Sequence, residues 1–207
     1  MNQDPALAEF VTYGREERNL EYKGTQGREP FIWKDYPVKA KTARTAMAMA
    51  NIGGGVIVIG MDEVASDRWE ANGVTPEADQ TYQQDEVQQF VNQYANPYVE
   101  LALRHIDVDG KRFVIIQMSG FRESPVICTG GDGRHLRAAA VYTRSFTKHE
   151  TIEVRDPAEM RELLDRAIEA GVEKRLRPFM QAFRETFGGL SPQDIDARRF
   201  EEQRGGL

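Results

Sequence analysis

Apolar residues recur along the chain with two periods, and each period predicts a type of element. From Val38 to Ala50 the apolar residues return every three or four positions, as on one face of a helix, while Lys41 and Arg44 lie on another face. Pro178 is expected to kink or split the helix that contains it. The same helical period and the helix-start signals predict further helices over Pro5–Thr12, Gln83–Tyr94, Pro157–Ala170, Arg175–Phe187 and Ser191 to about Gln203.

β-rich runs fill the space between these helices. Two of them, Val99–Val108 and Arg112–Met118, flank Asp109-Gly110, a dipeptide that favours a tight hairpin turn because both central residues need a positive φ. The other predicted strands are Leu20–Lys23, Val56–Met61, Val126–Cys128 and Leu136–Arg144. A sheet of about five or six strands is an ordinary size. The pattern therefore predicts an α+β fold in which helices flank a mixed β-sheet, with a helical extension at the C-terminus.

The length and composition suit one folded domain with an appendage. The 207 residues are 40% hydrophobic and 29% charged, which is typical of a globular chain. We expect a domain over residues 1–155 and the helical extension over 156–207. The longest apolar run, Val56–Ile59, is far shorter than the ~20 residues of a membrane span, so no membrane association is expected. Without a signal-peptide pattern, and with Cys128 as the only cysteine, a cytoplasmic location is expected.

Charge is distributed unevenly along the chain. The net charge of −6 argues against a protein that coats nucleic acid by its overall charge. Residues 1–110 carry 10 basic and 18 acidic side chains, whereas residues 111–150 carry 7 basic and 3 acidic ones. The middle of the chain is therefore basic, and it could meet phosphates.

Three glycines, Gly53 to Gly55, separate the helix that ends near Ala50 from the strand that starts at Val56. A phosphate-binding P-loop has the opposite order, strand then glycines then helix, and ends in Gly-Lys-Ser/Thr. The glycines are interpreted as a helix cap with a tight turn into the strand, and no ATP is expected as a cofactor.

Acidic residues stand beside two of the predicted strands. Glu16, Glu17 and Glu21 occur in and before the first strand, and Asp62 and Glu63 follow Val56–Met61. Carboxylates that meet at one edge of a sheet can bind a hard divalent cation. Such a cation can activate water against a phosphodiester, and Lys23, Lys41 and Arg44 could supply positive neighbours.

Several separated pieces of the chain resemble the Schlafen-type AlbA-like domain. They are Glu16–Lys23, the stretch Ala46–Glu63 with its Ala-Asn-x-x-Gly-Gly pattern, Gly73, Tyr142-Thr143-Arg144 and Thr147, with Phe146 where a glycine is usual. The resemblance covers about residues 12 to 155. It implies a nucleic-acid-binding protein and, by position, a set of three acids, Glu16, Glu21 and Asp62, that holds Mg²⁺ or Mn²⁺ in the relatives that cut transfer RNA. It also implies a homodimer, because relatives with two such lobes form a basic cradle.

The residues themselves leave two of these assignments open. In a regular strand Glu17 shares a face with Glu21 and Glu16 points away, so periodicity favours Glu17 whereas the motif favours Glu16. Glu63 is the alternative to Asp62. The predicted contacts to nucleic acid are the basic residues Lys23, Lys41, Arg44, Arg134, Arg137, Arg144 and Lys148. Tyr142 and Phe146 either stack on unpaired bases or pack in the core.

Three functions follow as hypotheses. The first is a metal-dependent endoribonuclease that acts on structured RNA such as transfer RNA. The second is a non-catalytic module that binds DNA or RNA in a regulatory or defence protein. The third is a protein-interaction scaffold, since the amphipathic C-terminal helices could cover the sheet, a second copy or another protein.

Overall fold

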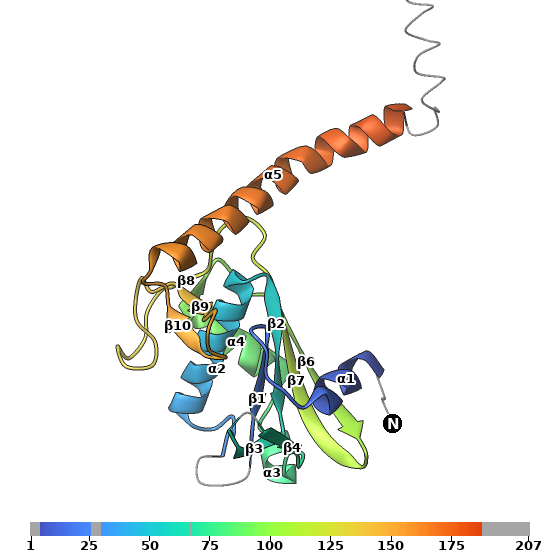
Figure 1. Cartoon of the computed structure of the whole chain (residues 1–207), viewed down its shortest axis with the longest axis vertical. Coiled ribbons are helices and arrows are strands. Elements are labelled where there is room, and N and C mark those ends of the chain that lie inside the picture. The colour runs from blue at the N-terminus through green and yellow to red at the C-terminus, as the bar shows by residue number, and fades with distance from the viewer. Residues whose placement is uncertain (1–4, 26–29, 67, 188–207) are drawn as a thin grey trace, which may run out of the picture.

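The computed structural model describes residues 5–25, 30–66 and 68–187. Its main sheet has the strand order β1-β2-β7-β6, in which only β1 and β2 run parallel. Its strands are β1 (Leu20–Lys23), β2 (Gly54–Ile59), β6 (Leu101–Val108) and β7 (Lys111–Ser119). The expected α+β fold with a mixed sheet and flanking helices is confirmed (Figure 1).

The main sheet has four strands rather than five or six, because the remaining strands pair with one another in three small ladders. These ladders join β3 (Met61–Ala65) to β4 (Arg68–Ala71), β5 (Ala95–Asn96) to β8 (Ile127–Cys128), and β9 (Tyr142–Arg144) to β10 (Thr151–Glu153). The predicted hairpin is confirmed, since Asp109 and Gly110 join β6 to β7 with φ values of 50° and 74°.

Each face of the sheet has its own apolar core. Alternation along β2 sends Ile57 and Ile59 to one face and Val56 and Val58 to the other. The first face is covered by α2 (Tyr36–Asn51) and α4 (Gln84–Tyr94), and the second by α1 (Pro5–Tyr13). Full burial of one such side chain stabilises the fold by about 1.5–3 kcal/mol. The short α3 (Pro76–Asp79) lies beside β7.

The end of α2 is fixed by a buried side chain and by glycine. Asn51 is 1% exposed; its amide donates to the carbonyl oxygens of Val126 (2.9 Å) and Tyr142 (2.8 Å) and accepts from the Val126 N–H (2.7 Å). Gly53 and Gly54 follow with φ values of 102° and 114°, a region that side chains disfavour. The motif asparagine therefore ties α2 to the segment that leads into β8 and to the first residue of β9.

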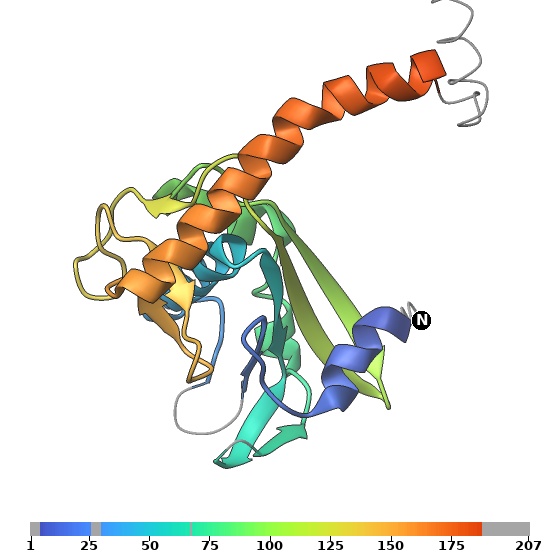
Figure 2. The ribbon, with the colours of Figure 1, turned by 45° about the horizontal axis from the view of Figure 1, so that its top comes forward.

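The C-terminal helix differs from its prediction. A single helix, α5 (Pro157–Phe187), replaces the two that were expected, and it continues through Pro178. No helix-breaking signal interrupts the apolar period between Ala170 and Arg175 except Gly171, whose cost in a helix is only about 1 kcal/mol. α5 contacts the body from its first turns to about its middle, where Arg166 lies beside Gly53 and Lys174 pairs with Glu123 at 2.5 Å. Its outer part extends away from the rest of the fold (Figure 2).

The predicted helix from Ser191 lies outside the described residues. Within the described part of the chain, no helix has the length and apolar character that crossing a membrane requires.

Candidate nucleic-acid interface

Glu21 lies in the interior, on the side of β1 that α2 covers. Strand alternation buries Leu20 and Tyr22 on the opposite face and turns Glu21 toward α2, where the Thr45 hydroxyl donates to it at 3.5 Å. Glu21 is only 6% exposed, and its two carboxylate oxygens accept separate cations, Lys23 at 2.6 Å and Arg144. The acid that the motif marks is therefore neutralised within the fold.

Arg144 is completely buried and joins three segments. Besides its ion pair with Glu21, its guanidinium donates to the Thr151 hydroxyl at 3.1 Å and to the Arg18 carbonyl oxygen at 3.0 Å. The Arg18 side chain donates back to the Arg144 carbonyl oxygen at 3.0 Å. The structure thus corrects the expected phosphate contact at Arg144, because no part of this guanidinium reaches solvent. Arg144 holds β9 and β10 against β1.

The pKa values of the two neighbouring glutamates move in opposite directions. Burial favours the neutral acid at Glu21, but the charges of Lys23 and Arg144 outweigh it, so the pKa of Glu21 lies below its ordinary value. Burial raises the pKa of Glu16, although its carboxylate accepts the Tyr22 N–H at 2.8 Å. The charge of Glu21 raises the Glu16 pKa further.

Glu16, and not Glu17, lies with Glu21. The backbone turns between Glu17 and Leu20, which exchange N–H···O bonds of 3.0 and 3.1 Å, so regular strand alternation does not extend back to these residues. Glu17 is exposed and accepts the Tyr13 hydroxyl instead. The periodicity argument failed because it assumed a longer strand.

Asp62 stands at the start of β3, opposite Glu70 in the β3–β4 ladder. Its carboxylate lies directly over the backbone of Gly24, where a Cβ would overlap it. The alternative acid, Glu63, is exposed. Among the described residues, no three His, Cys, Asp or Glu side chains are arranged to hold a metal ion.

This donor set does not fit Mg²⁺ or Mn²⁺ as it is arranged. Each oxygen of Glu21 is already bound to a cationic side chain, and a divalent cation would have to displace Lys23 or Arg144. A hard cation needs several free oxygen ligands at about 2.0–2.1 Å. In this conformation Glu21 serves as the structural partner of Lys23 and Arg144.

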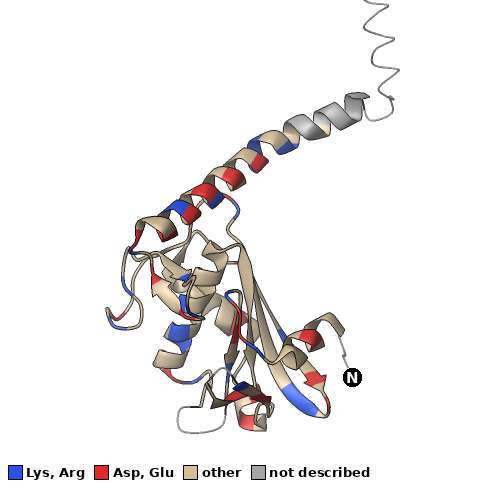
Figure 3. Ribbon diagram, viewed as in Figure 1, with Lys and Arg blue, Asp and Glu red and all other residues tan. Residues whose placement is uncertain are grey.

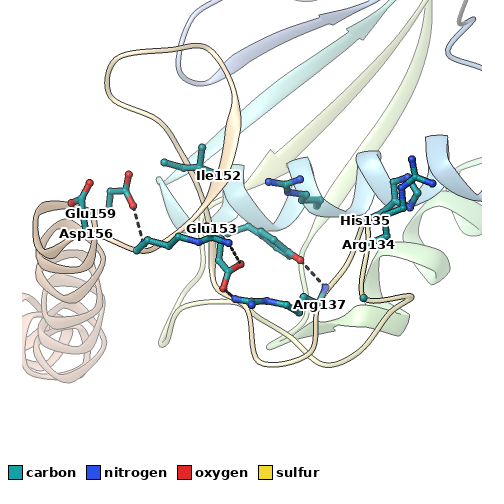
Figure 4. A pocket seen from close by; sticks show the side chains of 11 residues that line it. Arg134, His135, Arg137, Ile152, Glu153, Asp156 and Glu159 are labelled. Carbon is teal, nitrogen blue, oxygen red and sulfur yellow. Dashed lines mark hydrogen bonds and ion pairs between the residues drawn. The ribbon is translucent and has the colours of Figure 1, made fainter.

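Four arginines meet instead around a cavity of about 610 Å³ (Figure 4). Arg44 comes from α2, Arg134 and Arg137 from the loop between β8 and β9, and Arg155 from the segment after β10. The same cavity is also lined by three acids, Glu153, Asp156 and Glu159. Sequence analysis predicted three of these arginines and missed Arg155, whose nearby acids in the sequence gave no sign of a basic site.

The arginines differ in how far they are already neutralised. Glu153 lies between Arg137 and Arg155 and forms ion pairs with both, the second at 3.4 Å. Arg44 donates to the Thr151 carbonyl oxygen at 2.9 Å and lies over the Tyr142 ring, 5.1 Å from its centroid. No ion pair of the Arg134 side chain occurs within the described residues. Arg134 is therefore the most available of the four.

A turn built on Asp132 presents Arg134. One carboxylate oxygen of Asp132 accepts the N–H groups of Arg134 (3.1 Å), His135 (2.7 Å) and Leu136 (3.2 Å). The other oxygen meets the His135 ring at 2.7 Å, and this bond, with the three N–H donors, lowers the pKa of Asp132. A fixed turn of this kind limits the entropy lost when the loop binds a ligand.

The other predicted basic residues are spread over the surface. Lys41 is exposed on α2, one turn before Arg44, whereas Lys148 is exposed beside Glu150 at 3.9 Å. Lys23 is half-buried and bound to Glu21. Tyr142 is buried in the core, and Phe146 is exposed with the Arg18 guanidinium 4.0 Å from its centroid. The base-stacking alternative therefore no longer includes Tyr142.

The solved structures that resemble the chain include two of low identity. The DIP2311 protein from Corynebacterium diphtheriae is 17% identical with a TM-score of 0.48; the match covers 77% of this chain and 27% of that protein. The N-terminal domain of a protein from Nitrosomonas europaea, described as related to the ATP-dependent DNA helicase RecG, is 15% identical with a TM-score of 0.45. That match covers 76% of this chain and 97% of the domain. No curated relative matches.

One family model, described as "Schlafen, AlbA_2", matches residues 16–153. The match includes β1 with Glu21, the Asn51 and glycine turn, and the β9–β10 ladder with Arg144. It thus covers most of the chain, including all the segments that the buried ion pair joins. The chain belongs to the Schlafen AlbA_2 family.

Proposed function

We propose that this chain is a nucleic-acid-binding domain that holds phosphate groups of RNA or DNA in the cavity of Arg44, Arg134, Arg137 and Arg155. Membership of the Schlafen AlbA_2 family indicates a nucleic-acid-related function. The observation that carries the proposal is the convergence of four arginines from three separate segments on one cavity. Guanidinium groups match the geometry of phosphate oxygens and can bind them through paired hydrogen bonds.

The acids in the cavity determine how it would bind. A phosphate that enters the cavity competes with Glu153 for Arg137 and Arg155. Arg134 forms no ion pair within the described residues, so a phosphate can bind it without breaking one. Four arginines against three acids leave a small positive excess. Binding by this domain is therefore expected to be moderate, independent of sequence, and sensitive to salt.

Cleavage of a structured RNA such as transfer RNA is the second candidate. It is favoured by Glu16 and Glu21, which lie within electrostatic reach of each other. The ion pairs of Glu21 argue against it, because its carboxylate is not free to bind Mg²⁺ or Mn²⁺. The geometry supports binding without cleavage better.

A binding assay tests the first proposal. Fluorescence anisotropy is measured with labelled single-stranded RNA, transfer RNA and duplex DNA, for the wild-type chain and the Arg134→Ala/Arg137→Ala double variant. The matched control is Arg122→Ala, an exposed arginine paired with Glu100 and not part of the cavity lining. The double variant is expected to bind at least tenfold more weakly, and the control to bind like wild type. Equal binding by the double variant would refute the assigned surface.

An incubation with transfer RNA separates the two candidates. The wild-type chain is mixed with the RNA in Mg²⁺ or Mn²⁺, beside Glu21→Gln and Asp62→Ala. We expect intact RNA in every sample. Cleavage by wild type that both variants lose, while circular dichroism shows them folded, would instead establish the nuclease.

A further inference from the structure

A cluster of four aromatic side chains lies beside the arginine cavity. Its members are Trp33, Tyr36, Phe90 and Tyr94. Phe90 lies at the centre and meets the other three rings edge to face, with centroid distances of 5.6, 6.1 and 5.3 Å. Trp33 is buried, whereas Tyr36 is 36% exposed and is the most exposed of the four. The cluster therefore reaches the surface at Tyr36.

His135 joins this aromatic cluster to the cavity. It lines the cavity, and its ring centroid lies 6.3 Å from that of Tyr36. Figure 4 shows His135 beside Arg134, at the end of the cavity away from Asp156 and Glu159. The exposed tyrosine and the most available arginine are therefore at the same end of the cavity.

Tyr36 is held by the same turn that presents Arg134. Its hydroxyl is hydrogen-bonded to Tyr94 and to the backbone of Asp132. Desolvation, followed by the hydrogen bond with Tyr94, raises the pKa of Tyr36 to about 12, so the hydroxyl stays neutral and does not repel a phosphate. A ring that is already fixed loses little entropy when a ligand binds to it.

The surroundings of Tyr36 suit the flat face of a nucleobase. The rings of Phe90 and His135 meet it at 72° and 78°, so neither is stacked flat on it. Tyr36 begins α2, whose first turns are basic because they carry Lys39 and Lys41 (Figure 3). Aromatic rings set among cationic side chains are how proteins bind single strands, since every base has a face that can stack.

We infer that Tyr36 is a stacking surface for one unpaired base of the nucleic acid whose phosphates the cavity binds. The ligand of this site is therefore a single-stranded stretch of RNA or DNA. The inference rests on the proposed function, because the arginines hold the backbone from which the base reaches Tyr36. Bases in a duplex are stacked on one another and offer no free face to the ring, so a duplex contacts only the basic side chains.

Substitutions at Tyr36 test the inference by fluorescence anisotropy of the full chain. Tyr36→Leu keeps an apolar side chain but removes the ring. It is expected to weaken binding of a single-stranded oligonucleotide at least about fivefold, the low end for one base stacked on an aromatic ring. Its affinity for a duplex should stay unchanged, which also shows that the variant is folded. Tyr36→Phe, which keeps the ring, should retain most of the affinity that Tyr36→Leu loses.

The matched control is Tyr98→Leu, the same change at a tyrosine that is 61% exposed and does not line the cavity. It should bind like wild type. Both the RNA and the DNA form of the oligonucleotide are titrated, and the form that loses affinity with Tyr36→Leu identifies the nucleic acid. An oligonucleotide with one 2-aminopurine reports stacking directly, because stacking quenches its fluorescence. Wild type should quench it more than Tyr36→Leu does.

The outcomes separate this inference from the function on which it rests. Single-strand affinity that is unchanged in Tyr36→Leu, while Arg134→Ala/Arg137→Ala still weakens it, would overturn the stacking role alone. An equal loss for single strand and duplex, or a loss in Tyr36→Phe as large as that in Tyr36→Leu, would do the same. Absence of binding by wild type to every oligonucleotide would overturn both proposals.

Discussion

Arg144 and Glu21 form an ion pair that is almost closed to solvent, so each residue depends on the other. We predict that Arg144→Met lowers the free energy of unfolding by about 3–5 kcal/mol, the range for breaking a buried ion pair, since one buried oxygen of Glu21 loses its cation and Lys23 is left to balance the carboxylate. Glu21→Gln/Arg144→Met should recover part of this loss. Urea denaturation at pH 7 measures both.

The control for this prediction is Arg122→Met, which breaks the exposed pair with Glu100. Its cost should stay below about 1 kcal/mol, because exposed ion pairs contribute little. Equal costs for Arg144→Met and Arg122→Met would mean that the buried pair is not a structural support.

The lowered pKa of Glu21 makes its contribution to stability depend on pH. A carboxylate whose pKa is lower in the folded state stabilises the fold above the ordinary glutamate pKa of about 4.3, and that stability is lost as pH falls through the folded pKa. The stability difference between wild type and Glu21→Gln should therefore be largest near neutral pH and shrink below about pH 4. Urea titrations at several pH values measure it, and a difference that grows on acidification would contradict the assignment.

The sequence alone could not show which charged residues are buried in ion pairs, because the partners are distant in the chain. An arginine in a basic segment is usually exposed, so the sequence alone indicates a phosphate contact at Arg144. Its burial depends on Glu21, which is 123 residues away in the chain. Glu16 could be recognised by motif but not by periodicity, because a turn replaces the strand at that point.

At the scale of elements, Asn51 joins α2 to two distant segments. Asn51→Ala would leave the buried Val126 N–H and two carbonyl oxygens without partners, each at a cost of about 1–3 kcal/mol. We expect a loss of about 3 kcal/mol or more in thermal unfolding, with faster hydrogen exchange at the Val126 amide. Gln93→Ala, on the exposed side of α4, should cost less than about 0.5 kcal/mol. A similar small loss for Asn51→Ala would contradict the joining role.

Elements with strong local signals were predictable. The strand Leu20–Lys23, the helix around Val38–Ala50 and the Asp109-Gly110 hairpin all recur in the structure, since periodicity and turn chemistry determine them locally. The pairing of β9 with β10, and not with the main sheet, depends on contacts that no local pattern encodes. The continuous α5 was not predictable from a local pattern either. A proline disfavours a helix interior, yet α5 continues through Pro178.

At the scale of the whole molecule, the net charge of −6 hides a local arrangement. Some of the acids form ion pairs within the fold and so do not repel a polyanion as free charges would. Glu21 pairs with Lys23 and Arg144, and Glu162 pairs with Arg18. The cavity then collects arginines from segments that are distant in sequence. An acidic chain can thereby carry a basic site.

The salt dependence of nucleic-acid binding tests this account most directly. For each phosphate contact, log K falls against log salt with a slope of about 0.7 on single strands and about 0.9 on duplex DNA. The account predicts that wild type binds with a negative slope. Arg134→Ala/Arg137→Ala should reduce the magnitude of that slope by the amount expected for the loss of about two phosphate contacts. No binding by wild type at low salt, or an unchanged slope in the double variant, would contradict it.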